Sequence, residues 1–254
     1  MKITIITACF NRAGSIKTAI ESVLNQTFPN IEYIVVDGGS TDGSRDIISS
    51  YCDRIDKIIF KSDHGMYEGL NNAIREATGD IIGLCHSDDQ LYDEDTVKDV
   101  ACAFEKHPQA DMVYADGLFV NATTGKPVRV WKGHPLHRWR LVCGWLPLHT
   151  TCYVRRSVHE KYGLYDESYK IAADTKFLLS VLYTHRIKTV SIPQYVVRMR
   201  MGGASTDKER MKDMWKEDIR VFKETGFHFP VVMKAMKMLW KPMQFVRGWV
   251  MSRK

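Results

Sequence analysis

The chain has 254 residues, of which 44% are hydrophobic and 26% charged, with a formal net charge of +6. This length suits one large α/β domain or two small ones, and the composition excludes a disordered or collagen-like chain. No run of about 18 or more uncharged apolar residues occurs, so we expect no transmembrane helix, and the apolar start is too short for a signal peptide. The six cysteines form no Cys-x-x-Cys pair, which favours a reducing compartment and no disulfide framework.

Hydrophobic periodicity predicts alternating strands and helices over the first 115 residues. The expected strands are residues 3–8, 31–36, 56–61, 81–85 and 112–115, and the expected helices are 13–26, 44–51, 66–77 and 93–106. This alternation predicts a mostly parallel, doubly wound sheet with right-handed crossovers.

The second half is less regular. We expect a hairpin of residues 118–120 and 127–130, helices at 157–162 and 175–184, and strands at 188–192 and 196–200. No Pro/Gly/Ser-rich linker separates the halves, so we expect them to share one cleft.

The most informative motif is Ser87-Asp88-Asp89, two carboxylates directly after the fourth strand. In open α/β sheets, ligands bind outside the carboxyl ends of the strands. Adjacent carboxylates repel unless a cation or donor groups stabilise them, and hard divalent cations prefer oxygen ligands. The pair therefore predicts a metal–diphosphate site; the alternative is an acidic turn that caps the helix near Asp93.

Asp37 follows the second strand, where a carboxylate can accept hydrogen bonds from a ribose hydroxyl or a base N–H. The alternative is a turn-forming Asp before Gly38-Gly39. The Gly-x-Gly-x-x-Gly fingerprint after the first strand and the Gly-x-x-x-x-Gly-Lys-Ser/Thr phosphate loop are both missing. A metal clamp on the phosphates is the route that remains.

The strand-end motifs resemble family-2 glycosyltransferases of the GT-A fold, in the branch that builds bacterial O-antigen, capsule and exopolysaccharide. The resemblance spans roughly residues 3–205 and rests on Thr-Ala-Cys-Phe-Asn-Arg at 7–12, Val-Val-Asp-Gly-Gly-Ser-Thr-Asp-Gly at 35–43, Asp-His-Gly-Met-Tyr at 63–67 and Ser-Asp-Asp at 87–89. It implies a GT-A domain over 1–205, with a nucleotide-sugar-binding half (1–116) and a mixed acceptor half (117–205), followed by C-terminal helices (206–254).

The resemblance also implies roles for single residues. Asp37 would bind uracil or another base, and Asp89 would ligate a divalent Mn or Mg ion that bridges the two phosphates. Further donor contacts would come from residues that line the nucleoside pocket or hold the ribose or sugar: Thr7, Ala8, Phe10, Arg12, Asp63, Asn71 and Asp88.

The acceptor half contains a matching carboxylate motif, Ala172-Ala173-Asp174, in which Asp174 would be the general base; many relatives have Glu where Ala173 stands. An acceptor hydroxyl must lose its proton as it attacks, which requires a base within hydrogen-bond reach. The alternative for Asp174 is an N-cap of the following helix. His149 would contact donor sugar or acceptor, unless it is a structural histidine, and Gly202 and Gly203 would lie in a loop that closes over the diphosphate.

The C-terminal segment interleaves bulky apolar residues with Lys and Arg, and Pro242 interrupts it. This basic amphipathic pattern is typical of an interfacial membrane anchor on an anionic leaflet. The alternative is a helix packed on its own domain or on a partner subunit. The basic residues mix with apolar ones and no recognition motif is present, so we do not expect nucleic-acid binding.

These observations predict an inverting, metal-dependent glycosyltransferase that takes a nucleotide-diphospho-sugar, in the first place a UDP-sugar. By the resemblance, the acceptor would be a polyprenyl-diphosphate-linked saccharide, and the protein would be cytoplasmic and peripheral on the inner face of the membrane. Two alternatives are a sugar-nucleotide nucleotidyltransferase, which needs a Gly-rich basic loop that is absent after the first strand, and a non-catalytic nucleotide-sugar-binding protein, which does not need all four carboxylates.

Overall fold

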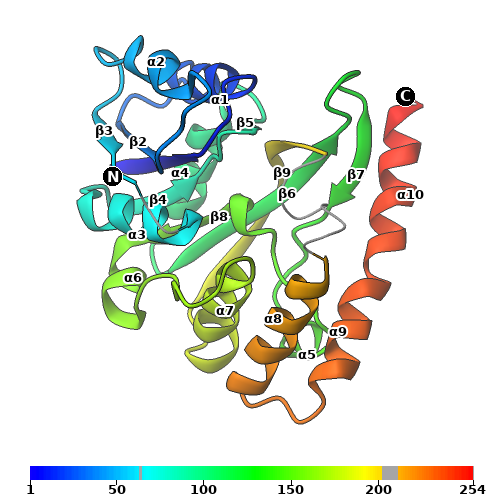
Figure 1. Cartoon of the computed structure of the whole chain (residues 1–254). Helices are drawn as coiled ribbons and strands as arrows, with labels where there is room; N and C mark the ends of the chain where they lie inside the picture. The colour runs from blue at the N-terminus through cyan, green and yellow to red at the C-terminus, as the bar shows by residue number, and fades with distance from the viewer. Residues whose placement is uncertain (63–64, 202–210, 254) are drawn as a thin grey trace.

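The computed structural model describes residues 1–62, 65–201 and 211–253. Within this part of the chain nine strands form one sheet in the order β3-β2-β1-β4-β8-β6-β9-β5, and β7 adds to β6 (Figure 1). The strands are β1 (Ile3–Cys9), β2 (Ile31–Asp37), β3 (Lys57–Phe60), β4 (Ile81–Leu84), β5 (Asp89–Leu91), β6 (Met112–Val120), β7 (Pro127–Trp131), β8 (Cys152–Arg155) and β9 (Thr189–Arg200).

The first four strands form the parallel part of the sheet, as expected. Helices cover both faces, so the doubly wound prediction is confirmed. Helix α3 (Met66–Glu76) packs its Leu70 and Ile74 on one face, and α1 (Ile16–Leu24), α2 (Ser44–Ser49) and α4 (Thr96–Lys106) pack on the other. Each of these helices buries one apolar stripe of 3.6-residue period, which is why the sequence pattern located them.

The second half continues the same sheet with mixed pairing, because β8 runs antiparallel to both β4 and β6. The expected hairpin is present as β6 and β7. Residues 188–192 and 196–200 were predicted as two strands, but they form the single strand β9, which pairs with β6 and β5. Long-range pairing holds these residues extended in spite of Pro193.

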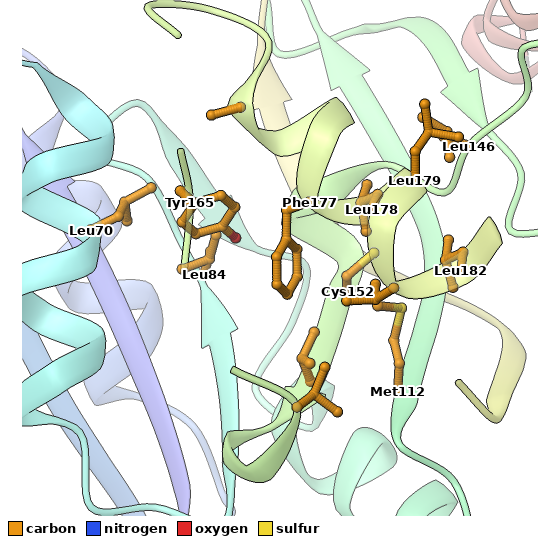
Figure 2. Close-up of a cluster of buried hydrophobic side chains, with 14 of the residues drawn as sticks. Leu70, Leu84, Met112, Leu146, Cys152, Tyr165, Phe177, Leu178, Leu179 and Leu182 are labelled. Atoms are coloured by element: carbon orange, nitrogen blue, oxygen red, sulfur yellow. The ribbon is translucent and has the colours of Figure 1, made fainter. Parts of the chain in front are cut away.

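The remaining helices gather beside the second half of the sheet: α5 (Arg138–Val142), α6 (Arg156–Tyr162), α7 (Ala173–Leu179), α8 (Met211–Glu224), α9 (Pro230–Leu239) and α10 (Lys241–Ser252). Two single-turn elements complete the set, the 3₁₀ helix η1 (His149–Thr151) and the π-helix η2 (Ser180–Thr184). Side chains from α3, β4, β6, β8 and α7 meet in one apolar cluster, which includes Leu84, Met112 and Phe177 (Figure 2). No helix among these described residues is long and apolar enough to cross a membrane.

Helix α10 lies along β7 at the edge of the molecule (Figure 1). The contact depends on Gly248, since a Cβ there would lie 2.2 Å from the carbonyl oxygen of Val128. Gln244 joins the same contact, because its Oε1 accepts a hydrogen bond of 2.6 Å from Arg129 Nε. The backbone of α10 therefore approaches the edge strand more closely than any side chain at position 248 would permit.

Replacing Gly248 by alanine is expected to destabilise the protein by about 1–3 kcal/mol, because overpacking forces the helix off the strand. Thermal unfolding measures the loss, which corresponds to about 2–4 °C per kcal/mol for a chain of this size. Gly14→Ala is the control, because a Cβ at Gly14 meets nothing within 4 Å. Equal melting temperatures of the two variants would contradict the predicted close contact.

Candidate active site

Three loops meet at one edge of the parallel sheet. Strands β2, β1 and β4 are neighbours and run in the same direction, so the residues after Cys9, Asp37 and Leu84 emerge together. Hydrogen bonds lock the first loop onto the second: Asn11 N donates to Ser40 Oγ at 2.8 Å, and Arg12 N donates to Ser44 Oγ at 2.8 Å. The carboxyl ends of these three strands therefore converge at one place.

Asp37 ends β2 with one oxygen satisfied and one open. Its Oδ1 accepts hydrogen bonds from Ser40 N at 2.9 Å and from Arg45 Nε at 2.7 Å. Burial alone would raise the pKa of this carboxyl, but the hydrogen bonds from Arg45, Ser40 and Gly39 outweigh it and lower the pKa. The buried Oδ2 has no hydrogen-bond partner among the described residues. Asp37 thus forms the turn and also offers an ionised oxygen to an N–H or O–H donor.

Asp88 and Asp89 stand in contrasting environments. Asp89 begins β5 and is 2% exposed, and its Oδ2 lacks a hydrogen-bond partner within residues 1–62, 65–201 and 211–253. Burial, followed by the charge of Asp88, raises the pKa of Asp89 well above its usual value. The side chain of Asp88 is 30% exposed, with its Oδ2 4.0 Å from Arg12 Nε. Helix α4 begins at Thr96 with Asp95 as its cap, so the Asp88–Asp89 pair is not a helix cap.

A hard divalent cation fits this arrangement. A buried carboxylate with a free oxygen and a second carboxylate beside it is stabilised in its charged form by such an ion. No group of three or more His, Cys, Asp and Glu side chains gathers into a complete cage in the described part of the chain. Oxygens of a bound diphosphate would therefore have to complete the coordination, as is common for magnesium sites.

Asp174 lies in the first turn of α7, whose N-cap is Ala172, so the alternative reading of Asp174 as the N-cap does not hold. Its Oδ1 accepts a hydrogen bond of 2.7 Å from Thr175 N and lies 3.4 Å from the hydroxyl of Tyr67. Its Oδ2 lies 3.4 Å from His149 Nδ1. The carboxylate side chain remains 25% exposed, so it can meet a ligand while two flanking groups hold it.

His149 lies between Asp174 and a second histidine. Its Nε2 lies 3.0 Å from Nε2 of His86, the residue directly before Ser87-Asp88-Asp89. Burial lowers the pKa of both rings, to about 3 for His86, and in His149 the charge of Asp174 opposes this shift. Apolar side chains and both Asp174 and His149 line a cavity of about 10 Å³ at this place, which is the size of about one water molecule. The ring of His149 therefore contacts Asp174 on one side and His86 on the other.

Two residues predicted to contact the donor, Thr7 and Asn71, are buried and make hydrogen bonds within the protein. Thr7 is fully buried, and its hydroxyl donates to the carbonyl of Cys85 at 2.6 Å, which ties β1 to the segment after β4. Asn71 is 1% exposed; its Nδ2 donates to the carbonyl of Tyr165 at 2.8 Å and to Glu167 Oε1 at 2.7 Å. The side chains of Thr7 and Asn71 therefore hold neighbouring segments and have no donor group left for a nucleotide.

The other predicted positions differ in what the structure describes. Phe10 is 59% exposed at the edge where the strand ends meet, and Ala8 is half-buried against the apolar cluster. Asp63, Gly202 and Gly203 lie outside the described residues. Sequence reasoning missed His86, Tyr67 as a neighbour of Asp174, and Arg45 as the cation on Asp37. No local signal pairs His86 with His149, because 63 positions separate them.

The mixed sheet and its helices define a GT-A glycosyltransferase fold. The family model described as glycosyl transferase family 2 matches residues 4–163, and the chain belongs to that family. It is 29% identical over 177 residues to the PGL/p-HBAD biosynthesis glycosyltransferase of Mycobacterium tuberculosis, covering 68% of this chain and 67% of that protein. It is 27% identical to the uncharacterized glycosyltransferase EpsJ of Bacillus subtilis, over 77% of this chain and 60% of that protein.

Solved structures agree on the fold. TarS of S. aureus superposes with a TM-score of 0.68 at 20% identity, covering 88% of this chain and 39% of that one. The mannosyltransferase PcManGT of Pyrobaculum calidifontis, solved with GDP-Man and Mn²⁺, has a TM-score of 0.68 at 16% identity and covers 98% of this chain and 73% of that one. The present chain thus spans about two fifths of that TarS chain.

Proposed function

We propose that this protein transfers one sugar from a nucleotide-diphospho-sugar, in the first place a UDP-sugar, to a lipid-linked saccharide acceptor, with inversion at the anomeric carbon. One observation carries the proposal: Asp37 and Asp89 each keep a buried carboxylate oxygen without a partner among the described residues. Asp37 ends β2 and Asp89 follows β4, and the carboxyl ends of these strands meet at one edge. Unpaired buried carboxylate oxygens are costly, so they mark places where a ligand completes the hydrogen bonds or the charge balance.

The donor would be held at both of its ends. Asp37 Oδ2 would accept the N–H of the base, and Phe10, exposed at the same edge, would cover the nucleoside. Asp88 would bind a ribose or sugar hydroxyl. We propose UDP as the nucleotide of the donor. Among the similar structures, TarS was solved with UDP-GlcNAc and PcManGT with GDP-Man.

Asp89 would hold the divalent ion, Mn or Mg, against the donor diphosphate. When bound, such an ion offsets the charge that develops on the diphosphate as it leaves. Arg12, whose Nε lies 4.0 Å from Asp88 Oδ2, adds a fixed positive charge beside the same carboxylate pair. The rival nucleotidyltransferase would need a Gly-rich phosphate loop, and the loop after β1, residues 10–15, contains a single glycine, Gly14.

Asp174 would act as the general base. As the acceptor oxygen forms its bond to the anomeric carbon, the bond from that carbon to the diphosphate breaks, and the acceptor proton passes to the carboxylate of Asp174. A single displacement of this kind inverts the anomeric centre. The non-catalytic alternative predicts that donor binds without any turnover.

A donor panel tests the proposal. Purified protein is incubated with UDP-, GDP- and TDP-sugars and Mn²⁺ or Mg²⁺, and release of nucleoside diphosphate is measured with and without a polyprenyl-diphosphate saccharide. We expect UDP release that depends on the metal and rises with the acceptor. Release of pyrophosphate from a nucleoside triphosphate and a sugar phosphate would instead identify a nucleotidyltransferase.

We further propose that the C-terminal helices dock on the anionic inner face of the cell membrane, where a lipid-linked acceptor would lie. Helix α10 exposes its bulky apolar side chains. Gln244 and Gly248 are buried against β7, whereas Val246, Trp249 and Val250 are 46–56% exposed. A surface helix normally buries its apolar stripe and exposes its polar residues. Its own-domain contact thus uses the polar side and leaves the apolar side uncovered.

The surrounding charge complements anionic lipid. Residues 225–254 contain six Lys and Arg and no Asp or Glu, although Lys234 is buried and pairs with Asp218. Exposed apolar side chains also occur on α9, on α5 and directly before α9: Val231, Val232, Leu239, Trp139 and Phe229. Basic residues around an apolar surface are what binding to anionic headgroups requires.

Replacing both Val246 and Trp249 by serine is expected to weaken binding to vesicles that contain phosphatidylglycerol by at least about tenfold, since each loses buried apolar area in the interface. Co-sedimentation at low and high salt measures the binding, and salt should weaken it for the wild type. Met66→Ser, which changes an exposed apolar residue on α3, is the control. A wild type that ignores vesicles and instead dimerises through this face would overturn the membrane proposal.

A further inference from the structure

A pair of buried histidines connects the loop of Asp88 and Asp89 to Asp174. The carbonyl oxygen of His86 accepts a hydrogen bond of 3.0 Å from Asp89 N, so His86 belongs to the turn that carries the carboxylate pair. Its ring faces His149 at 3.0 Å between the two Nε2 atoms, and the opposite nitrogen of His149 faces Asp174 Oδ2 at 3.4 Å. His86 is 8% exposed and the side chain of His149 is 17% exposed, so solvent does not separate the two rings.

Two constraints assign the same protonation to this array. Of two neutral imidazoles that meet through Nε2, one must donate and the other accept. If His149 donated to His86, its bare Nδ1 would face the Asp174 carboxylate, and lone pairs would repel. His86 Nδ1 has no partner in the described part of the chain, and a lone acceptor there is less costly than a stranded N–H. The proton of each ring therefore lies on Nε2 in His86 and on Nδ1 in His149.

We propose that His149 is a positioning residue that aims the Asp174 carboxylate through its Nδ1–H, and that His86 holds His149 in the tautomer this requires. The proposal rests on the proposed function in one respect, that Asp174 is the base. Neither histidine touches substrate in this account.

The array leaves Asp174 little rotational freedom. Thr175 N holds Oδ1 from the backbone, Tyr67 lies beside the same oxygen, and the hydroxyl of Tyr67 is itself anchored to the carbonyl of Ile171 at 2.5 Å. His149 faces the other oxygen. A separation of 3.4 Å is long for a hydrogen bond, and such contacts at catalytic sites often shorten when substrate binds. Loss of the N–H would let the carboxylate turn away from the acceptor hydroxyl.

Asparagine and glutamine at position 149 separate the two contacts of the ring. An Asn side chain can place its amide nitrogen near the position of Nδ1, where it donates to Asp174, and a Gln side chain can place its amide oxygen near the position of Nε2, where it accepts from His86. His149→Asn therefore keeps a donor for Asp174 and loses His86, whereas His149→Gln keeps His86 and loses the donor. We expect kcat to fall by about 100-fold in His149→Gln, the usual cost of a misplaced catalytic group. In His149→Asn we expect kcat to fall by only about tenfold.

At position 86, glutamine is instead the substitution expected to preserve activity. His86→Gln retains a donor near Nε2 and should keep more activity than His86→Leu, which leaves the tautomer of His149 unspecified. The KM for donor should stay within about threefold in all four variants, because the positioning concerns Asp174 and not the donor contacts. His107→Gln, an exposed histidine after α4, is the control, and melting temperatures report folding.

A measurement without substrate tests the geometry independently. In ¹⁵N-detected NMR of the histidine rings, His149 should show a protonated Nδ1 and His86 a protonated Nε2. The opposite tautomer of His149, or equal activity of His149→Gln and wild type, overturns the positioning role while the proposed function stands. If wild type transfers no sugar from any donor, the proposed function fails, and the NMR result still decides whether the array exists.

Discussion

Asp174→Asn is expected to lower kcat for sugar transfer by about 10²–10⁴-fold, the range for loss of a general base, while donor binding stays within a few-fold of wild type. The amide keeps the size of the side chain and can still accept from Thr175 N, so the first turn of α7 should be unaffected. Steady-state kinetics with acceptor and calorimetric titration with UDP-sugar measure the two quantities separately.

Asp53→Asn serves as the matched control, since Asp53 is an exposed carboxylate that follows α2 in the chain and does not belong to the loops at the strand ends. It should leave both quantities unchanged. An Asp174→Asn variant that loses donor binding in proportion to its activity would contradict the role as base and would make Asp174 a donor ligand instead.

Asp89→Asn is expected to abolish metal-dependent transfer and to remove the stabilisation that Mn²⁺ and UDP together confer on the wild type. The physical reason is that a divalent ion needs the ionised, unpaired Oδ2, which an amide does not supply. Thermal unfolding with and without Mn²⁺ and UDP measures the effect, and a ligand present at about 100 times its Kd should stabilise wild type by about 2.7 kcal/mol. Unchanged stabilisation in the variant would exclude Asp89 as the metal ligand.

Without metal, the free energy of unfolding of Asp89→Asn should equal or exceed that of the wild type. The direction of the effect follows from the pH dependence of stability. Burial and Asp88 raise the pKa of Asp89 in the folded protein. Between the ordinary carboxyl pKa and this raised value, the folded state binds the proton that the unfolded state has released, so stability falls as pH rises. Asp89→Asn removes this fall, which melting curves of both proteins from pH 4 upwards can detect. A fall with pH that persists in the variant would assign it to other groups.

The first half of the fold could be predicted because its signals are local. Strand β2 is a short apolar run that ends at Asp37, and α3 shows its buried stripe within eleven residues. Strand β9 could not be predicted as one element, since residues 193–195 look like a break until β6 pairs with residues on both sides of Pro193 and β5 pairs with residues 197–199. Pairing partners distant in the chain, and not propensity, hold that strand together.

The candidate site divides in the same way. Asp37, Asp88, Asp89 and Asp174 could be picked out by residue type and by their place after strands or before a helix. The functions of Thr7 and Asn71 could not, because a buried hydrogen bond to Cys85 or Tyr165 leaves no trace in the local pattern. The contact of His86 with His149 was invisible for the same reason.

By itself the sequence determined the order of strands and helices in the nucleotide half, the carboxylates at the strand ends and the basic, apolar character of the last thirty residues, since each depends on neighbours in the chain. Tertiary structure alone decided which carboxylate oxygens stay unpaired, which histidines meet, and which side of α10 lies against β7. These depend on groups that folding brings together from distant positions, and burial then sets their charge and their hydrogen bonds.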